Sequence, residues 1–411
     1  MGETTADPSG AARPVPPGPA LRATVLLIAL RTAYAYNWFS IGPALPSVSR
    51  AFGVAPSAWG ILIAAFLIGA GAAQVPSGLL ARRYGTRAIS LVGTGLLGGA
   101  AAASAFAPTY ASLVVLRGLA GAGAGLFFSP AIALVGSLHA EGHRGVPVGV
   151  FSSAFSAGAG LGVFASALLI PYIGWRGALL FGGLLLLGLL LPSVAAIPST
   201  VGRPAPSPSR GQIPFALRSP AVWAMGVAFI GLEGASLSAG QYFVPFAESV
   251  HGWSPTLAGA LGALFVFPSV FGGPVGGRLT ERSRRRRSHM VLATAVPAVL
   301  LLLVPAVGLA ATAAIGIAFS VSYGMVYAMM YVLAPYLPGL PPEEVPLAIG
   351  LFNGVQLCGG AGVAFAAALV VGTWGYSWAW VLLGLATLAP LGVLALVPRT
   401  EPGPVSGARP S

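Results

Sequence analysis

Long apolar stretches separated by short polar breaks run from about residue 23 to residue 398. A helix crosses the roughly 30 Å hydrocarbon core of a membrane in about 20 apolar residues, so each stretch predicts one membrane span. The predicted spans are residues 23–47, 57–80, 88–107, 109–137, 146–172, 175–197, 220–247, 256–277, 289–308, 311–337, 346–372 and 376–398. The run within 289–337 is too long for one span, and we expect it to fold back near Gly308. The pattern predicts an all-α membrane protein with 12 transmembrane helices.

A segment rich in proline and serine divides these spans into two sets of six. We therefore predict a bundle at 23–197, a cytoplasmic linker at 198–219 and a second bundle at 220–398. Residues 1–22 and 399–411 are rich in proline and glycine and lack a secretory signal pattern, so we expect disordered cytoplasmic tails.

The two halves repeat one another. A shift of 199 residues places Pro46, Gly53, Pro56, Gly60 and Gly78 on Pro245, Gly252, Pro255, Gly259 and Gly277. A shift of 200 or 201 residues places Phe151, Gly162 and Gly174 on Phe352, Gly362 and Gly375. Eight matches at a nearly constant offset predict two pseudo-symmetric bundles, as in many secondary transporters.

Composition excludes several classes of protein. Apolar residues make up 56% of the chain and charged residues only 7%, which argues against a soluble protein. All 21 basic residues are arginine, so the chain has no lysine for an ATP-binding phosphate loop. Cys358 is the only cysteine, and we expect His139 and His143 to lie in an ordinary loop, so we predict neither a metal site nor a cofactor.

The arginines predict the orientation in the membrane. Four of the 21 lie within spans (Arg31 and Arg117) or at the predicted outer side (Arg50 and Arg176), and the other 17 lie on the side of the termini. Positive charge favours the cytoplasmic side, so we expect a plasma-membrane protein with both termini inside. The run 282–287 is then an anchor near membrane lipids, and the net charge of +12 requires no nucleic-acid partner.

Three motifs carry a family resemblance: 78-GLLARRYGTR-87, 117-RGLAGAGAG-125 and 174-GWRGALLFGG-183. The chain resembles the major facilitator superfamily over essentially its full folded length. The family signature after span two reads roughly G-x-L-a-D-R-x-G-R-[RK], which Gly78, Leu80, Ala81, Arg83 and Gly85 match. Arg87 lies one place beyond the usual basic position, and Arg82 stands where the family has aspartate.

The resemblance implies two six-helix bundles that rock about a central site, and a loop after span two that clamps the cytoplasmic side. The second copy of the loop keeps Gly277, Glu281 and Arg282, so Glu281 is the expected acidic partner in the clamp. The alternative is that the arginines are only topological anchors. Val163 stands where drug antiporters of the family carry a span-five proline, which weakens a drug-export interpretation.

Charged groups within a span are costly and mark functional sites, so Arg31, Arg117 and Glu233 are the leading candidates. The resemblance implies that spans one, four, seven and ten line the cavity. Those spans add further candidates for substrate binding: Tyr34, Asn37, Gln241, Tyr242, Tyr323, Tyr327 and Tyr331. The last three are spaced four apart and share a helix face. The alternatives are that the tyrosines only pack, that Arg117 is structural, and that Arg31 and Glu233 neutralise each other.

We predict a secondary active transporter of a small organic solute, with Glu233 as the proton-linked carboxylate. Arginine, tyrosine and amide side chains suit a small organic anion or a polar aromatic compound. The alternatives are a proton-linked drug or natural-product exporter and a receptor that kept the fold without transport. No nucleophile and base recur at triad-like positions, so we expect no enzyme. The expected partners are substrate, protons and lipids, and we expect a monomer.

Overall fold

A computed structural model describes residues 16–139, 145–201, 214–283, 285–334, 337–341 and 344–396. The helices of the first half are α1 (Pro17–Phe39), α2 (Leu45–Phe52), η1 (Pro56–Ala58), α3 (Trp59–Tyr84), α4 (Thr86–Ser104), α5 (Tyr110–Ser137) and α6 (Gly145–Ala196). Those of the second half are α7 (Phe215–Arg218), α8 (Pro220–Ala228), α9 (Ile230–His251), α10 (Pro255–Leu264), α11 (Ser269–Arg282), α12 (Arg286–Leu301), η2 (Val304–Ala306), α13 (Leu309–Leu333), α14 (Val345–Trp374), α15 (Tyr376–Leu388) and η5 (Ala389–Leu396). The predicted all-α fold is confirmed for these residues.

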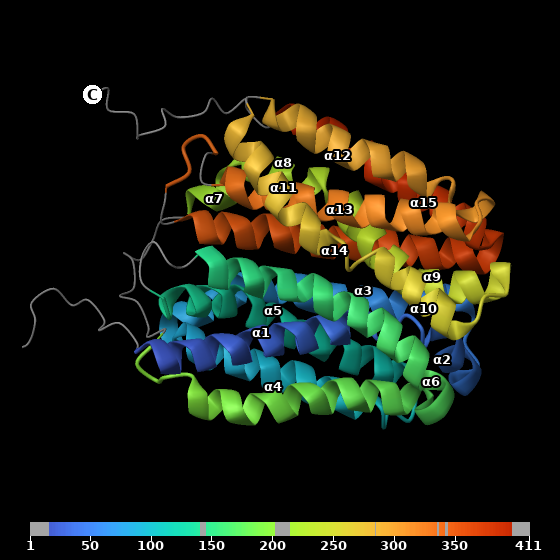
Figure 1. Cartoon of the computed structure of the whole chain (residues 1–411), viewed down its shortest axis with the longest axis horizontal. Helices are drawn as coiled ribbons and strands as arrows, with labels where there is room; N and C mark the ends of the chain where they lie inside the picture. Colours follow the sequence, from blue (N-terminus) through green and yellow to red (C-terminus); the bar gives the residue numbers. More distant parts are fainter. Residues whose placement is uncertain are drawn as a thin grey trace, which may run out of the picture.

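The helices form two stacked groups that follow the two halves of the chain (Figure 1). Within the described residues, nine helical segments are long and apolar enough to cross a membrane. The longest, Pro147–Ala196, is two spans because the backbone leaves helical geometry at Gly174 (φ +67°). The nine segments therefore contain ten spans. Helix α4, which is short, and helix α1, which contains two arginines, are the other two of the twelve expected spans.

Several helices end elsewhere than expected. Helix α1 ends at Phe39 rather than at residue 47, because a turn over residues 40–44 precedes the short helix α2, which has Pro46 in its first turn. Span seven is divided into α8 and α9 at Phe229, and span eight into α10 and α11 around Phe265–Pro268. Gly308 is the N-cap residue of α13, so the predicted fold-back there is confirmed.

The predicted repeat appears in the backbone itself. Gly53 and Gly252 both cap helices in the left-handed region, with φ of 64° and 66°. Gly174 and Gly375 both turn the chain between two spans, with φ of 67° and 85°. Glycine adopts such angles without strain, so these repeated glycines have the same structural role in the two bundles.

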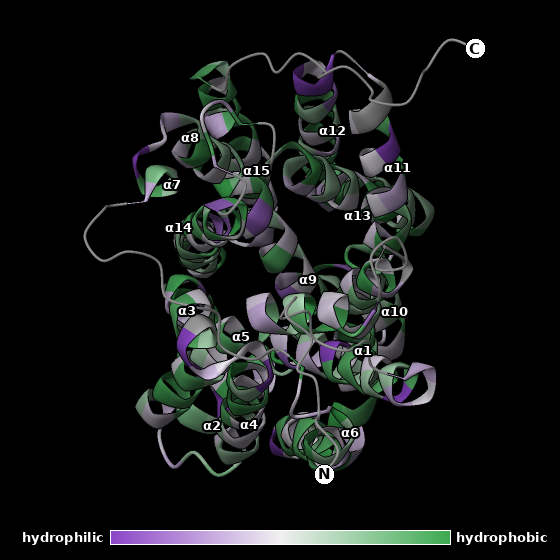
Figure 2. Cartoon of the chain, turned by 90° about the vertical axis from the view of Figure 1, so that its left-hand side faces the viewer, coloured by the Kyte–Doolittle hydropathy of each residue, from purple (hydrophilic) through white to green (hydrophobic). Residues whose placement is uncertain are grey.

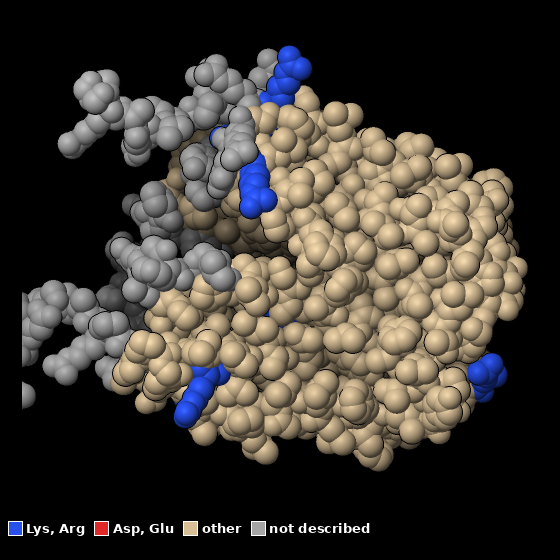
Figure 3. All heavy atoms as spheres, in the orientation of Figure 1, with Lys and Arg blue, Asp and Glu red and all other residues tan. Residues whose placement is uncertain are grey.

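The bundles meet along two seams. Helix α14 of the second bundle packs along α3 of the first, and α10 packs against α6. Arginine side chains lie mainly at the end of the molecule where α1 begins, on the left in Figure 3, which we call the arginine end. The surface between the bundles is hollowed toward that end (Figure 3).

Viewed from the arginine end, the two bundles lie on either side of a central region (Figure 2). Green, apolar residues predominate along the helices (Figure 2), as expected for segments that span a membrane. Helices α1 and α9, which carry Arg31 and Glu233, come from different bundles and contact each other.

Candidate functional site

Arg31 of α1 is enclosed by aromatic rings. Its Cζ atom lies 4.5 Å from the ring centroid of Tyr34, 4.4 Å from Phe128, 5.6 Å from Phe151 and 4.7 Å from Phe155. We call these four residues the aromatic cage. Arg31 is 6% exposed, and its Nε and Nη1 atoms are buried without a hydrogen-bond partner. Ring faces stabilise the positive charge but accept no strong hydrogen bond, so two donors are left available.

Glu233 of α9 and the tyrosines of α13 form a polar group on the second bundle. The Tyr323 hydroxyl donates a 2.8 Å hydrogen bond to Glu233 Oε2, and the Tyr327 hydroxyl donates one of 2.8 Å to Asn353 Oδ1. The rings of Tyr323 and Tyr327 lie 5.0 Å apart, and those of Tyr327 and Tyr331 lie 5.4 Å apart. The expected shared helix face is therefore observed.

These two groups lie on different bundles, since Arg31 is on α1 whereas Glu233 and the tyrosines are on α9 and α13. The guanidinium is surrounded by the aromatic cage, and Glu233 accepts its hydrogen bond from Tyr323. In this conformation the two charges have different partners, which argues against simple mutual neutralisation.

Arg117 and Asn37 hold the first bundle together. Arg117 is 1% exposed, donates from Nη1 to the carbonyl of Asn37 at 3.2 Å, and places Cζ 4.4 Å from the Phe66 ring centroid. The Asn37 amide donates to the carbonyls of Ala33 and Gly182, both at 2.9 Å. These contacts favour the structural interpretation of Arg117 that the sequence had left open.

Gln241 and Tyr242 lie toward the end opposite the arginine end. Tyr242 is nine residues beyond Glu233, or about 13 Å along the helix axis. Its hydroxyl donates to the Ala364 carbonyl at 3.0 Å, and its ring stacks on Trp59. A Cβ added to Gly42 would lie 2.7 Å from Gln241 Cα, so α9 and the turn after α1 are in close contact here. These residues pack the two bundles together at this end.

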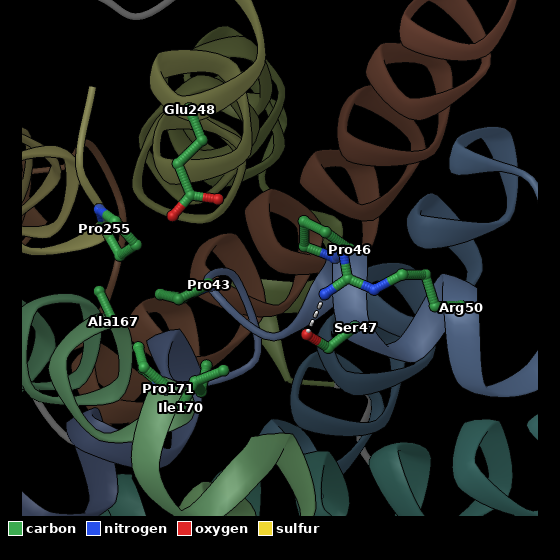
Figure 4. A pocket seen from close by; sticks show the side chains of 9 residues that line it. All are labelled: Pro43, Pro46, Ser47, Arg50, Ala167, Ile170, Pro171, Glu248 and Pro255. Atoms are coloured by element: carbon green, nitrogen blue, oxygen red, sulfur yellow. Dashed lines mark hydrogen bonds between the residues drawn. The ribbon is translucent and has the colours of Figure 1, made fainter. Parts of the chain in front are cut away.

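A small pocket lies at the same end, between the bundles (Figure 4). Its volume is about 250 Å³, and prolines from both bundles line it. Arg50 of α2 extends toward it from the first bundle and donates from Nη2 to Ser47 Oγ at 3.0 Å. Glu248 of α9 points toward it from the second bundle (Figure 4). Opposite charges therefore lie on the two sides of the pocket.

The basic loop after span two contacts its own bundle. Arg87 donates from Nε to the Ile197 carbonyl at 3.0 Å and from Nη2 to the Val194 carbonyl at 2.7 Å, which joins the start of α4 to the end of α6. Gly85 turns the chain between α3 and α4 with φ of +90°. Arg83 is exposed and lies over the ring of Tyr84.

The clamp itself stays a prediction. A Cβ added to Gly78 or Gly277 would meet no atom within 4 Å, so these glycines have open space around them in this conformation. The side chains of Arg82, Glu281 and Arg282 lie outside the described part of the structure. His143 also lies outside the described residues. His139 is described, and its Nε2 atom lies 2.8 Å from Thr24 Oγ1. Among the residues described, no group of three or more metal-binding side chains occurs.

Sequence reasoning missed the cage phenylalanines and Asn353. Phe128 and Phe155 looked like ordinary apolar span residues, and nothing local shows that they face a buried arginine. Asn353 could have been found by listing amides within spans, and the repeat also placed its neighbour Phe352 on Phe151 of the cage. Phe352 packs against Tyr331 with ring centroids 5.8 Å apart.

Comparison with known proteins agrees with this architecture. The family model of the Major Facilitator Superfamily matches residues 27–339. The chain is 27% identical to the probable nitrate/nitrite transporter NarK2 of Mycobacterium tuberculosis over 280 residues, covering 65% of this chain and 67% of that one. It is 32% identical to the 4-hydroxybenzoate transporter PcaK of Pseudomonas aeruginosa over 161 residues, covering 39% of this chain and 36% of that protein. The D-xylose–proton symporter structure matches with a TM-score of 0.71 at 16% identity, covering 93% of this chain and 99% of that one.

Proposed function

Because the chain belongs to the major facilitator superfamily and is thus a multi-pass secondary transporter of small solutes, we propose that it carries a small organic anion together with protons. Family and fold are those of transporters rather than enzymes. The observation that supports the proposal is that one bundle carries a buried arginine in α1 and the other carries a buried carboxylate in α9. Arg31 attracts the anion, and Glu233 carries the proton.

The proposed mechanism is alternating access. We infer that the arginine end is cytoplasmic, since positive charge favours that side, and that both termini lie there. Close packing at Gly42 and Trp59 together with the hollow toward the arginine end supports an inward-facing conformation. Substrate would reach Arg31 from the cytoplasm in this state and from outside after the bundles rock.

An organic anion fits this surrounding better than a small inorganic one. The rings of the aromatic cage and of α13 offer apolar area that nitrate would leave unused. The resemblance to a 4-hydroxybenzoate transporter supports the same substrate class, while the resemblance to a nitrate/nitrite transporter supports anion transport more generally.

Glu233→Gln in proteoliposomes tests the proposal. The variant should still exchange a preloaded radiolabelled organic acid, because the substrate-binding groups remain, but it should not accumulate that acid under an imposed pH gradient. The matched control is Ser238→Ala on the same helix, whose hydroxyl is buried without a partner and should not affect coupling. Unchanged gradient-driven accumulation by Glu233→Gln would contradict the proton role. Gradient-driven movement of dyes or drugs alone would favour the exporter alternative.

A further inference from the structure

We propose that Tyr323 positions the carboxylate of Glu233 and determines the pH at which this carboxylate releases its proton. The inference rests on the proposed function, in which Glu233 carries the proton, and adds to it a positioning residue on a second helix. Tyr323 lies on α13 and Glu233 on α9, so their contact joins two helices of the second bundle.

The first argument is the environment of the Glu233 side chain. It is 3% exposed, and a charged carboxylate that is shielded from water needs hydrogen-bond donors to be stable. A Cβ added to Gly360 of α14 would lie 3.4 Å from Glu233 Cγ and 3.1 Å from the backbone nitrogen of Gly234. Helix α14 therefore covers one side of the Glu233 side chain with a glycine, which has no side-chain donor to offer.

The second argument is the hydrogen bond that the carboxylate does accept. The Tyr323 hydroxyl donates to Glu233 Oε2 at 2.8 Å, although the two residues are 90 positions apart in the sequence. A hydrogen bond is stronger when its acceptor is an ionised carboxylate than when it is a neutral carboxylic acid. The bond therefore stabilises the ionised form of Glu233 more than the protonated form, and it favours release of the proton.

The third argument is that Tyr323 is itself held in place. Its ring lies 5.0 Å from the ring of Tyr327, one helical turn further along α13. The Tyr327 hydroxyl donates to Asn353 Oδ1 of α14 at 2.8 Å, which fixes the position of Tyr327. The Tyr323 ring therefore packs against a neighbour that is anchored to another helix, and this packing keeps its hydroxyl directed toward Glu233.

The other ionisable groups of α13 and α1 that face Glu233 are phenols. Those of Tyr327 and Tyr331 on α13, and that of Tyr34 on α1, lie within range of its charge. A phenol is uncharged near neutral pH, so these side chains add no charge beside the carboxylate. The charged residue at this level of α1 is Arg31, whose guanidinium is enclosed by the aromatic cage.

The remaining helices packed on α9 bring little charge to this region. Helices α8, α10, α14, α15 and η5 contain no charged residue, and their ionisable residues are Cys358 and Tyr376. The charged residue of α6 is Arg176, which donates to backbone carbonyls of the first bundle. The next charged residue of α9 itself is Glu248, fifteen positions further on. The stability of the Glu233 carboxylate therefore depends on its hydrogen bonds.

The test follows the Glu233 carboxyl group by infrared difference spectroscopy on the full-length protein in lipid nanodiscs. The C=O stretch of a protonated carboxyl disappears when the proton is released, and the band of Glu233 is identified by its absence in Glu233→Gln. Tyr323→Phe should move the titration midpoint of this band to higher pH by about one to two units, because a hydrogen bond to a charged acceptor is lost.

A stronger donor should have the opposite effect. Fluorination makes the tyrosine hydroxyl a better donor, so a fluorinated tyrosine incorporated at position 323 should move the midpoint to lower pH. Tyr327→Phe should shift it less than Tyr323→Phe, since the Tyr327 hydroxyl donates to Asn353. Tyr242→Phe is the matched control on α9, because its hydroxyl donates to a backbone carbonyl of α14, and it should leave the midpoint unchanged. A role of Tyr323 in packing alone predicts no pair of opposite shifts.

Transport provides a second measurement of the same effect. The pH profile of gradient-driven organic-acid accumulation by Tyr323→Phe should shift in the same direction as the infrared band. Phenylalanine keeps the ring that packs against Tyr327, so the thermal unfolding midpoint at a pH where Glu233 is protonated should stay close to that of the wild type. The fluorinated protein keeps the hydroxyl as well, and it provides the test on its own if Tyr323→Phe does not fold.

The same titration midpoint in the wild type, Tyr323→Phe and the fluorinated protein would overturn the role of Tyr323. The proposed function stands in that case if Glu233→Gln still abolishes gradient-driven accumulation. The expected band shifts combined with unaltered accumulation by Glu233→Gln would instead disprove the proton role in transport and support the positioning of the carboxylate by Tyr323. A Glu233 band that does not titrate over the pH range in which the protein stays folded contradicts both.

Discussion

Gly60 of α3 lies directly against Ala368 of α14: a Cβ added to Gly60 would sit 2.8 Å from Ala368 Cβ and 2.6 Å from Phe365 Cα. The repeat reproduces this contact at the other seam, where a Cβ on Gly259 would sit 2.6 Å from Ala167 Cβ. Small residues let membrane helices approach closely, so a glycine–alanine contact closes each of the two seams.

Gly60→Val should therefore open the end opposite the arginine end. Overpacking of this kind costs about 1–3 kcal/mol. The cost destabilises the conformation in which the seam is closed and leaves the open conformation unaffected. Spin labels at Phe106 and Val250, both exposed, on a Cys358→Ser background should report a longer distance in the variant. Gly99→Val, where a Cβ meets no atom within 4 Å, is the control and should leave the distance unchanged. An unaltered distance in Gly60→Val would show that this seam does not control closure.

Much of the fold can be predicted from the sequence because a lipid environment permits few kinds of backbone structure. Backbone groups in hydrocarbon must bond within a helix, so apolar length predicts spans. The breaks at Phe229 and around Phe265–Pro268 could not be predicted, because distant contacts accompany them. A Cβ on Gly231 would clash with the Ala386 carbonyl oxygen, and Thr387 donates to the Gly231 carbonyl at 3.3 Å. Those partners are more than 150 residues away.

The repeated turns predict matched losses of stability. Gly174→Ala and Gly375→Ala each place a side chain at positive φ with an extended ψ, a region essentially restricted to glycine, which costs roughly 1–3 kcal/mol. Both should lower the thermal unfolding midpoint by similar amounts. Gly188→Ala, in α6 with open space around it, should leave the midpoint unchanged or raise it. A clear loss in only one of the two variants would contradict the equivalence of the repeated turns.

The site was only partly predictable, for a physical reason. Charge within a span identified Arg31 and Glu233, and four-residue spacing identified the face of α13 that carries Tyr331. Spacing does not tell which neighbours a side chain meets. Asn37 and Arg117 looked equally suitable as ligands, yet each bonds backbone carbonyls within the first bundle. That distinction depends on the position of helices far apart in the chain.

Arg87→Met should reduce stability rather than alter gating. Its guanidinium holds the carbonyls of Val194 and Ile197, and hydrogen bonds from a charged donor contribute about 1.5–3 kcal/mol when buried and less at this partly exposed position. The thermal unfolding midpoint should fall, with the 106–250 distance unchanged. Arg83→Met is the comparison, since Arg83 is exposed and lies over the exposed ring of Tyr84, and it should cost little. A changed distance in Arg87→Met would instead assign this arginine to the clamp.

The charges at the pocket of Figure 4 give a separate way to open the same end of the molecule. Arg50 and Glu248 lie on different bundles, and their attraction favours the closed seam. Glu248→Lys replaces it with repulsion, and because exposed pairs are worth up to about 1 kcal/mol the shift should be modest. The 106–250 spin-label distance should lengthen in low salt and return toward the wild-type value near 1 M salt, where exposed charges are screened. The double variant Arg50→Glu with Glu248→Arg restores opposite charges and should restore the distance. A lengthening that persists in high salt, or that the double variant does not reverse, would attribute closure to the packing at Gly60 and Gly259 alone.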